Sequence, residues 1–444
     1  MTSSGHAPAR RSAGSSALFT DHYELTMLSA ALRDGTADRP CVFEVFARRL
    51  PDGRRYGVVA GVDRVLDALA NFRFDDAELE MLARDEVVDG ETLEWLRRYR
   101  FSGDVDGYPE GELYFPGSPV LTVRGTFAEA VLLETLVLSI LNHDSAIASA
   151  AARMVSAANG RRIIEMGSRR THEESAVAAA RAAHLAGFAG TSNLEAGRRY
   201  GIPTTGTSAH SFTLVHDSEH EAFAAQVAAL GTGTTLLVDT YDISRGIDTA
   251  IEVAGTGLGA IRIDSGDVGV LARQAREQLD ALGATGTRIV VSGDLDEHAI
   301  AALRAEPVDG YGVGTSLVTG SGAPTASMVY KLVEVDGRPV AKRSSHKESR
   351  GGHKEAFRRH KPTGTAIEEV VYPVDGPPPK QGEDDRPLRI PLVRDGEVVP
   401  DRPSLEDNRQ RLRHALVSVP WEGLKLSHGE PAIPTVFPDS YGHG

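Results

Sequence analysis

Histidine, aspartate and arginine side chains follow several short apolar runs in the middle of the chain. His210 comes shortly after the run 202–206, together with Thr207, and Asp239 ends the next run. A carboxylate can orient an imidazole ring, and an imidazole held in this way can act as a base or accept a phosphoryl group. The chain has 15 histidines, so one histidine carries little weight by itself. Its place after a strand and its expected partner Asp239 make His210 the candidate catalytic residue.

The run 260–264 adds an arginine and a second carboxylate. Arg262 and Asp264 are two residues apart, so both side chains point to the same face of a strand. An inward arginine can bind a carboxylate through two hydrogen bonds, and an inward aspartate can hold a ribose hydroxyl or a metal-bound water. A buried ion pair between Arg262 and Asp264 is the alternative.

Two further features of the same region suit phosphate groups. Arg169 and Arg170 precede a predicted helix whose start, residues 171–174, has the pattern of a capping box. Two guanidinium groups beside a helix N-terminus make an anion site suited to diphosphate, unless they only balance Glu173 and Glu174 on the surface.

Glycine turns follow the last two apolar runs of this region. They contain Gly293 and Asp294 in one turn, and Gly314 and Thr315 in the other. Glycine lets backbone amides approach a phosphate, and the Thr315 hydroxyl can donate a hydrogen bond. Ordinary strand-end turns are an equally good interpretation of these glycines.

Tyr23 is a candidate ligand contact near the other end of the chain. It lies in a polar stretch, residues 20–27, and its ring could stack on a flat ligand. The pattern of this stretch on its own favours a tyrosine in the core of a helix.

The elements that would position these residues alternate between strand and helix. Seven short apolar runs are expected to be strands: Arg162–Met166, Gly187–Gly190, Ile202–Gly206, Thr235–Asp239, Ala260–Asp264, Arg288–Ser292 and Gly310–Val313. Helical patterns separate most of them, which predicts a parallel sheet whose carboxyl ends meet at a shared site. Short crossovers favour closure into an α/β barrel, with an open doubly wound sheet as the alternative.

The flanking parts of the chain have a different pattern. Residues 1–16 are expected to form a disordered tail because they are rich in Ser, Gly, Ala, Pro and Arg. Residues 17–127 are expected to form an α+β domain, completed by a C-terminal segment at 330–444. The barrel-like domain between them is expected to span 128–329, beginning with a long apolar helix to about residue 158.

The composition excludes some classes of function. A net charge of -14 over 444 residues disfavours general binding to nucleic acid or to anionic membranes. The longest apolar stretch, 131–141, is too short to span a bilayer and is expected to be a buried helix. Cys41 is the single cysteine, which fits a reducing compartment and a cytoplasmic location.

Several motifs follow one another in an order and spacing that resemble the nicotinate phosphoribosyltransferase family. They are Thr20–Met27, Glu165–Arg170, Gly206–Phe212, Asp239–Asp242, Arg262–Asp267, Gly312–Thr315, Gly352–Arg358 and Leu424–Thr435. The resemblance covers residues 17–435. It implies an irregular, seven-stranded, TIM-like α/β barrel with an α+β domain formed from both chain ends, in a homodimer with shared active sites. The implied activity forms nicotinate mononucleotide and diphosphate from nicotinate and 5-phosphoribosyl 1-diphosphate, with Mg²⁺ and coupled ATP hydrolysis, in NAD salvage.

The resemblance also implies roles for individual residues. His210 matches the histidine that ATP phosphorylates, while Tyr23 (contributed by the other subunit), Thr207 and Arg262 match nicotinate contacts. Thr315 matches a contact to phosphoribosyl diphosphate. Comparison with the related nicotinamide enzyme adds Arg169 for the diphosphate, Asp239 as partner of the histidine, and Asp264, Gly293 and Asp294 around the ribose and phosphate. Gly314, in the same glycine turn as Thr315, is also expected to contact phosphoribosyl diphosphate. Where the nicotinamide enzyme has an aromatic residue that stacks on the pyridine ring, this chain has Met166. The resemblance assigns no magnesium ligand.

Other functions remain as alternatives. Nicotinamide and quinolinate phosphoribosyltransferases are near relatives, and Arg262 alone does not distinguish them. A barrel aldolase needs a strand-borne lysine, but residues 161–328 contain none. A ligand sensor would be expected to lose the histidine or the Arg–Asp strand, and a type I phosphoribosyltransferase would need a phosphate loop that Ile243–Gly246 fits poorly.

Overall fold

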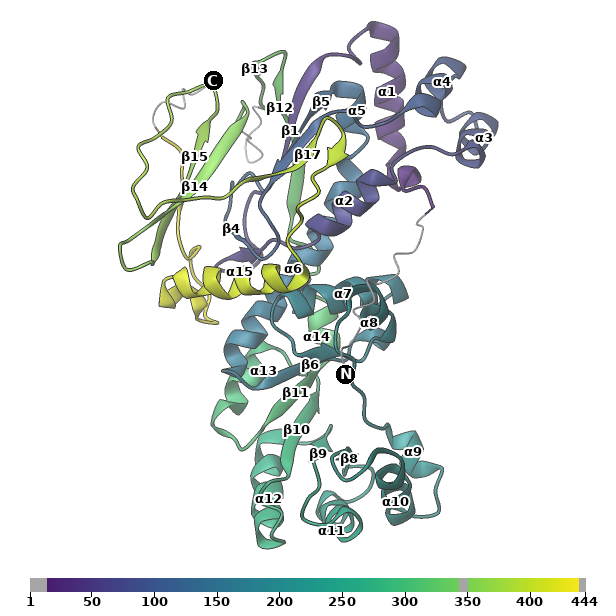
Figure 1. Cartoon of the computed structure of the whole chain (residues 1–444), viewed down its shortest axis with the longest axis vertical. Helices are drawn as coiled ribbons and strands as arrows, with labels where there is room; N and C mark the ends of the chain where they lie inside the picture. The colour runs from purple at the N-terminus through teal and green to yellow at the C-terminus, as the bar shows by residue number, and fades with distance from the viewer. Residues whose placement is uncertain (1–13, 343–349, 439–444) are drawn as a thin grey trace. The chain divides into compact units, whose positions relative to one another are not determined.

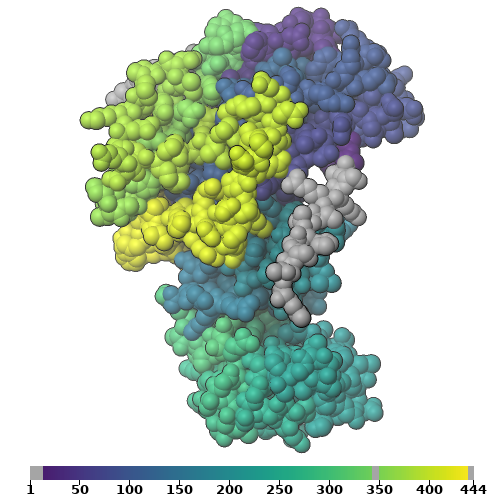
Figure 2. Space-filling model, in the orientation of Figure 1, coloured from purple at the N-terminus to yellow at the C-terminus, as the bar shows by residue number. Residues whose placement is uncertain are grey.

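The computed structural model describes residues 14–342 and 350–438 (Figure 1). The chain divides into two compact units. One contains residues 150–322, and the other combines residues from both sides of it, up to 149 and from 323 onward. Figure 2 shows segments from both ends of the chain, purple and yellow, on this second unit. The first boundary falls inside helix α6 (Glu134–Ala158).

The described chain begins at residue 14, inside the tail predicted for residues 1–16. Residues 1–13 of that tail lie outside the described residues. Ser15 Oγ donates to Arg73 O at 2.7 Å, and Ser16 Oγ donates to Ala68 O at 2.6 Å. The tail prediction is therefore wrong for these two serines, because their hydroxyl groups hold the chain against the last turn of α2 (Val62–Ala70) and the loop that follows it.

A six-stranded parallel sheet forms the centre of residues 150–322. Its order is β7-β6-β11-β10-β9-β8, and every pairing is parallel. The strands are β6 (Arg162–Glu165), β7 (Gly190–Thr191), β8 (Thr235–Leu237), β9 (Ala260–Ile263), β10 (Arg288–Gly293) and β11 (Gly310–Val313). The prediction of a mixed α/β fold with a parallel sheet is confirmed.

The predicted seven-stranded barrel is not confirmed. The run 202–206 forms a single parallel bridge, from Thr204 to Thr191, instead of a strand. Pro203 lacks an N–H group, so it can only accept, and its carbonyl oxygen takes the bond from Thr191 N at 3.0 Å. The hydrogen-bonded sheet of the described residues therefore has six strands.

Helices flank this sheet. They are α7 (Glu173–Leu185), α8 (Leu194–Tyr200), α9 (His210–Leu214), α10 (Glu219–Leu230), α11 (Ile243–Ala254), α12 (Val268–Ala281), α13 (Glu297–Ala302) and α14 (Thr315–Val318). The capping box predicted at 171–174 is wrong. His172 is the N-cap of α7, and its Nδ1 accepts from Glu174 N at 3.3 Å. The amphipathic pattern of residues 267–282 is typical of a helix, and α12 lies there with Asp267 as its N-cap.

The second unit is built on a seven-stranded antiparallel sheet, in the order β13-β12-β1-β5-β3-β17-β18. Three early strands lie together at the centre, β1 (Pro40–Ala47), β5 (Leu121–Thr126) and β3 (Asp104–Gly107). Late strands flank them on both sides: β12 (Met328–Val335) and β13 (Arg338–Pro339) next to β1, and β17 (Ile390–Arg394) and β18 (Glu397–Val398) next to β3. The apolar pattern of residues 340–342 would favour a strand, but β13 ends at Pro339. The core beside this sheet includes residues of α1 (His22–Asp34) and α5 (Phe127–Val131).

Smaller elements complete this unit. A four-stranded sheet contains β14 (Lys354–His360), β15 (Ala366–Pro373), β16 (Arg386–Pro387) and β19 (Thr435–Val436), and a two-stranded one pairs β2 (Gly57–Val58) with β4 (Leu113–Tyr114). The remaining helices are α2, α3 (Asp76–Arg84), α4 (Gly90–Arg98) and α15 (Leu405–Ser418).

The long apolar helix predicted from residue 128 is observed as α5 and α6, with a break at residues 132–133. Phe127–Ala158 is long and apolar enough, by length and composition, to cross a membrane. However, 61% of its most apolar window is buried inside the structure, as in a core helix.

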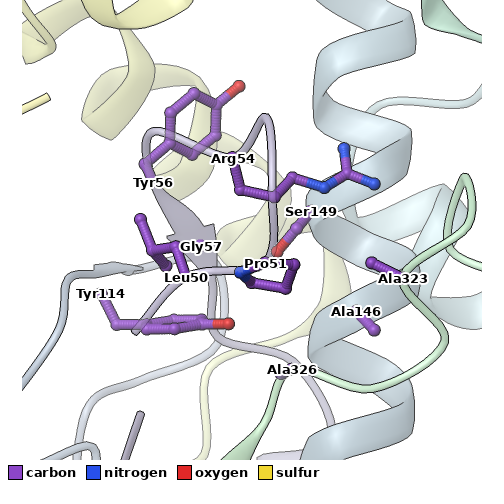
Figure 3. A pocket seen from close by; sticks show the side chains of 10 residues that line it. All are labelled: Leu50, Pro51, Arg54, Tyr56, Gly57, Tyr114, Ala146, Ser149, Ala323 and Ala326. Carbon is purple, nitrogen blue, oxygen red and sulfur yellow. The ribbon is translucent and has the colours of Figure 1, made fainter. Parts of the chain in front are cut away.

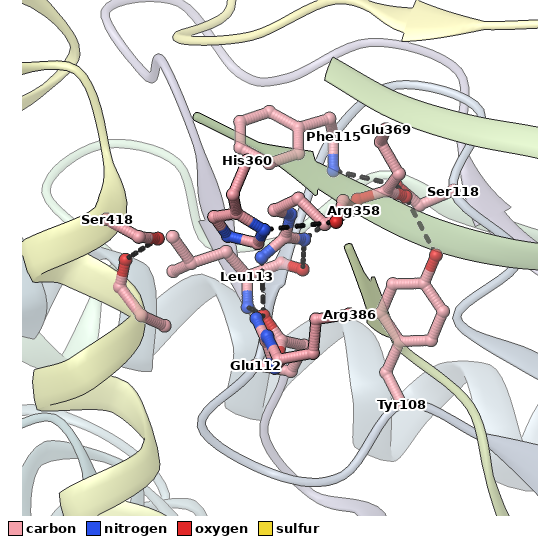
Figure 4. Close-up of polar contacts among 11 residues, drawn as sticks. Tyr108, Glu112, Leu113, Phe115, Ser118, Arg358, His360, Glu369, Arg386 and Ser418 are labelled. Atoms are coloured by element: carbon pink, nitrogen blue, oxygen red, sulfur yellow. Dashed lines mark hydrogen bonds and ion pairs between the residues drawn. The ribbon is translucent and has the colours of Figure 1, made fainter. Parts of the chain in front are cut away.

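A buried network of charges joins the two ends of the chain in the second unit (Figure 4). Arg358 Nη1 donates to Glu112 Oε1 at 2.6 Å, and its Nη2 donates to Glu369 Oε2 at 2.8 Å. All three side chains are at most 1% exposed. Burial by itself would raise the pKa of Glu112, but the charges of Arg358 and Arg386 and the hydrogen bond from Arg386 outweigh it and lower the pKa to about 2.

Removing Arg358 is expected to be much more costly than removing its neighbour Arg359. Arg358→Met leaves two buried carboxylates without their shared cation, so we expect a loss of about 3–5 kcal/mol in the free energy of unfolding. Arg359 is 34% exposed and pairs with Glu368, so Arg359→Met should cost at most about 1 kcal/mol. Urea denaturation of both variants measures the difference, and equal losses would contradict the central role of Arg358.

Candidate active site

The candidate site lies at the carboxyl edge of the six-stranded sheet. Because the strands are parallel, the segments that follow them meet at this edge. The predicted residues of this unit all lie in those segments or at the ends of the strands: Arg169, Thr207, His210, Asp239, Arg262, Asp264, Gly293, Asp294, Gly314 and Thr315. Tyr23 belongs to the other unit, on α1.

His210 is the first residue of α9, and its side chain is 40% exposed. Its Nδ1 lies 3.1 Å from Thr240 Oγ1, and its Nε2 lies 3.8 Å from Asp239 Oδ1. Asp239 is thus near the ring but beyond direct hydrogen-bond distance, and the closer partner is Thr240. Sequence reasoning did not assign Thr240, although it directly follows Asp239.

Asp239 is almost completely buried and links two neighbouring strand ends. Its Oδ2 accepts from Asp264 N at 2.9 Å and from Ser265 Oγ at 2.7 Å. Its Oδ1, on the side of His210, has no hydrogen-bond partner in the described structure. A buried carboxylate oxygen without a donor costs free energy, so this atom is suited to receive a proton or cation brought by a ligand or by the ring.

Arg262 joins the same group of side chains. Its Nη1 donates to Thr207 Oγ1 at 2.7 Å and to Ser208 O at 3.3 Å, while its Nη2 lies 3.7 Å from Asp264 Oδ1. The ion pair considered as an alternative is therefore present, but at a longer distance than the bond to Thr207. Ser292, another residue that sequence reasoning missed, donates its hydroxyl to Asp264.

Arg169 is exposed in a short 3-10 turn, Ser168–Arg170. The interpretation that it balances Glu173 and Glu174 is wrong: Glu174 pairs with Arg199 at 2.7 Å, and Glu173 lies 3.6 Å from His172 Nε2. Within the described part of the chain, no hydrogen bond or ion pair of the Arg169 side chain is found. Its guanidinium group is therefore available to an anion.

The two glycine turns differ in how strongly they are constrained. Gly293 has φ = +124°, and a Cβ placed there would lie 3.1 Å from Asp264 O. Asp294 and Thr315 are exposed, and Thr315 begins the four-residue helix α14 after its N-cap Gly314. The turn at Gly293 is thus one that only glycine adopts without strain.

Tyr23 is not a core residue. Its side chain is 45% exposed on α1. Partial burial, together with the neighbouring charge of Glu134, raises the pKa of its hydroxyl to about 12. The prediction of an accessible aromatic ring is favoured over the interpretation as a core tyrosine.

The structure also has a small pocket outside the candidate site (Figure 3). It lies in the second unit beside Arg54 and Tyr114, and none of the predicted site residues lines it. Ser149, at its edge, accepts from Val58 N at 2.9 Å and donates to Ser145 O at 2.6 Å. The polar group of this serine therefore serves the fold.

The chain is similar in sequence to known proteins over most of its length. Residues 18–142 match the nicotinate phosphoribosyltransferase N-terminal domain, and residues 161–365 match the nicotinate phosphoribosyltransferase family. The chain is 68% identical over 426 residues to nicotinate phosphoribosyltransferase pncB1 of Mycobacterium tuberculosis, covering 94% of each chain. It is 39% identical over 334 residues to the nicotinate phosphoribosyltransferase of Bacillus subtilis, covering 73% of this chain and 68% of that protein.

The fold of the chain is also similar to that of a solved structure. The crystal structure of human nicotinic acid phosphoribosyltransferase aligns with a TM-score of 0.83 at 27% identity, covering 95% of this chain and 98% of the human one. Fold and site together define an α/β enzyme with a histidine–aspartate–arginine site at the carboxyl edge of a parallel sheet. The chain belongs to the nicotinate phosphoribosyltransferase family.

A side chain at position 293 is expected to damage the site. Gly293→Ala forces a left-handed conformation on alanine and pushes its Cβ toward Asp264 O, so we expect a loss of about 1–3 kcal/mol in stability. Gly286→Ala, just before the same strand, is the control, because nothing lies within 4 Å of its added Cβ. The midpoint temperature of unfolding and the rate of phosphoribosyl transfer should both fall in Gly293→Ala and stay near normal in Gly286→Ala.

Proposed function

We propose that the chain forms nicotinate mononucleotide and diphosphate from nicotinate and 5-phosphoribosyl 1-diphosphate, as a cytoplasmic enzyme of NAD salvage. The observation that carries the proposal is the grouping of His210, Asp239, Arg262 and Thr207 at one sheet edge in a chain of this family. In the transfer, the pyridine nitrogen attacks the ribose carbon as the bond to diphosphate breaks. Diphosphate leaves with both bonding electrons.

In this proposal Arg262 and Thr207 bind the nicotinate carboxylate. Arg262 is 12% exposed and already points at Thr207, so its guanidinium group is held in place before the ligand arrives. Tyr23 stacks on the pyridine ring. Asp264, 30% exposed, lies where a carboxylate can hold ribose hydroxyls and stabilise positive charge at the reacting carbon.

Arg169 binds the leaving diphosphate, with Gly293, Asp294, Gly314 and Thr315 around the phosphates of the sugar. Mg²⁺ fits this arrangement as an ion carried by the substrate, since it commonly uses one or two carboxylates plus phosphate oxygens. Asp264 would hold it; Asp239, with an unpartnered oxygen, is the second carboxylate available. Among the described residues no three His, Cys, Asp or Glu side chains form a metal cage. The bound cation would neutralise charge on the diphosphate.

ATP enters the proposal as a co-substrate through His210. An imidazole nitrogen attacks the terminal phosphorus of ATP, a P–N bond forms, and ADP leaves. Water later attacks the phosphohistidine, which releases inorganic phosphate and restores the ring. The exposure of His210 gives ATP access, and Thr240 and Asp239 hold the ring.

We further propose a homodimer in which Tyr23 completes the site of the partner subunit. Phe19, Tyr23 and Met27 are spaced four residues apart and are 66%, 45% and 36% exposed, which makes an apolar stripe. Leu214 and Val215, just after His210, are 61% and 77% exposed. Burial of such surfaces between two copies would stabilise a dimer. We also propose that the sheet closes as an irregular seven-stranded barrel, with residues 202–206, which bridge to Thr191 through Thr204, in the place of the seventh strand.

Substrate choice tests the proposed function. Nicotinate, nicotinamide and quinolinate are offered in turn with phosphoribosyl diphosphate, with and without ATP, to the normal chain and to His210→Ala. We expect transfer to nicotinate, accelerated by ATP in the normal chain, and a residual rate in His210→Ala that ATP does not change. Preference for nicotinamide or quinolinate would overturn the substrate, and coupled ATP hydrolysis in His210→Ala would overturn the role of His210.

Mixed dimers test the shared site. Tyr23→Ala and His210→Ala chains, each lacking ATP-coupled transfer alone, are unfolded together and refolded at equal amounts. If the two residues come from different subunits, mixed dimers contain one intact site, and about a quarter of normal activity should return. No recovery, with dimers present by size-exclusion chromatography, would contradict the arrangement.

A further inference from the structure

Glu165 is a completely buried carboxylate at the carboxyl end of β6 that the proposed chemistry does not use. Its Oε2 accepts from Thr191 Oγ1, and its Oε1 accepts from Gly167 N. Both contacts are short, and both oxygens are engaged. Burial raises the pKa of Glu165, although these hydrogen bonds lower it.

These bonds are part of a closed ring. Thr191 Oγ1 accepts from Asn193 N at 2.9 Å, and Asn193 Nδ2 donates to Ser168 Oγ at 3.0 Å. Ser168 directly follows Gly167, whose N–H donates to Glu165, so the series of bonds closes on the residue where it began. The ring therefore ties the segment after β6 to the segment after β7.

The segment after β6 has little room to move. A Cβ at Gly167 would lie 2.3 Å from Val318 Cγ1 and 3.1 Å from Glu165 Oε1. Arg170 N donates to Gly167 O at 2.9 Å, which fixes the turn that follows. Arg169 lies within this turn and extends an exposed side chain.

We propose that Glu165, acting through its ring with Thr191, is the positioning residue that presents Arg169 to the diphosphate of phosphoribosyl diphosphate. The inference rests on the proposed function for the identity of that substrate. A rigid turn matters because no ion pair to another described residue holds Arg169, and ordering a long side chain at the moment of binding costs entropy.

Thr191→Val is the decisive variant, because it keeps the shape of the side chain and removes only the hydroxyl. We expect the KM for phosphoribosyl diphosphate to rise about tenfold, as on loss of one hydrogen bond to a charged group, while the kcat changes less than about twofold. Thr191→Ser keeps the hydroxyl and should restore a near-normal KM. Ser168→Ala opens the ring nearer the surface and should raise the KM about threefold.

A double-mutant cycle separates positioning from general damage. In an Arg169→Ala background, Thr191→Val should cause no further loss, because the residue it positions is already gone. An unchanged KM in Thr191→Val, or losses that add fully with Arg169→Ala, would overturn the inference.

The same cycle is repeated by calorimetry with inorganic diphosphate as the probe, which does not depend on turnover. If the normal chain fails to transfer to nicotinate while the binding cycle is non-additive, the proposed function fails and the role of Glu165 stands. If the enzyme is active but the losses in diphosphate binding are additive, the proposed function stands and the role of Glu165 is wrong. Thermal midpoints of all variants identify any that fail to fold, and Ser168→Ala then carries the test.

Discussion

Strand direction is the constraint on which residues 150–322 depend. Six parallel strands place all their carboxyl ends at one edge, while the strands themselves are covered and largely apolar. Polar side chains can then gather only where the strands stop. There they bond to one another: Asp239 after β8 accepts from Asp264 N after β9, and Ser292 in β10 donates to Asp264. The site is thus also a set of cross-links between strand ends.

The second unit meets a different constraint, since strands from the end of the chain flank strands from its beginning in one sheet. Residues 150–322 lie between these two parts of the chain, and bringing the parts together costs conformational entropy. Contacts between the two parts must offset that cost. Apolar pairing of β1 with β12 supplies one such contact, and the buried ions around Arg358 supply another. Lys354 adds a third, because its Nζ lies 2.7 Å from the buried Glu44 Oε2. Each of these pairs joins residues about 250–310 positions apart in the chain.

Sequence patterns predicted elements well where local signals agreed. The helix α12 has an amphipathic pattern and an Asp267 cap, and both are observed. These patterns failed at Pro203, where the backbone cannot donate, and at the start of α7, where the His172 ring instead of the Thr171 hydroxyl accepts the capping bond from Glu174 N. Within the site, residue types at strand ends predicted which side chains would share one edge. They could not predict that Thr240 would be nearer to His210 than Asp239 is, because one rotation of the ring decides it.

The unpartnered Asp239 Oδ1 shows why this carboxylate serves both fold and chemistry. A buried oxygen without a donor costs about 1–3 kcal/mol, and a structure selected for stability alone would satisfy it. Its other oxygen is held by Asp264 N and Ser265 Oγ, so the carboxylate cannot turn away. The nearest possible donor is His210 Nε2 at 3.8 Å, and a small movement of the ring would complete the bond. In the proposed mechanism that bond would place a proton on Nε2, and Nδ1 would attack phosphorus once the Thr240 hydroxyl, 3.1 Å away, turns from it. In the proposed mechanism, the free-energy cost of the unpartnered oxygen would be offset when the ring of His210 moves against it.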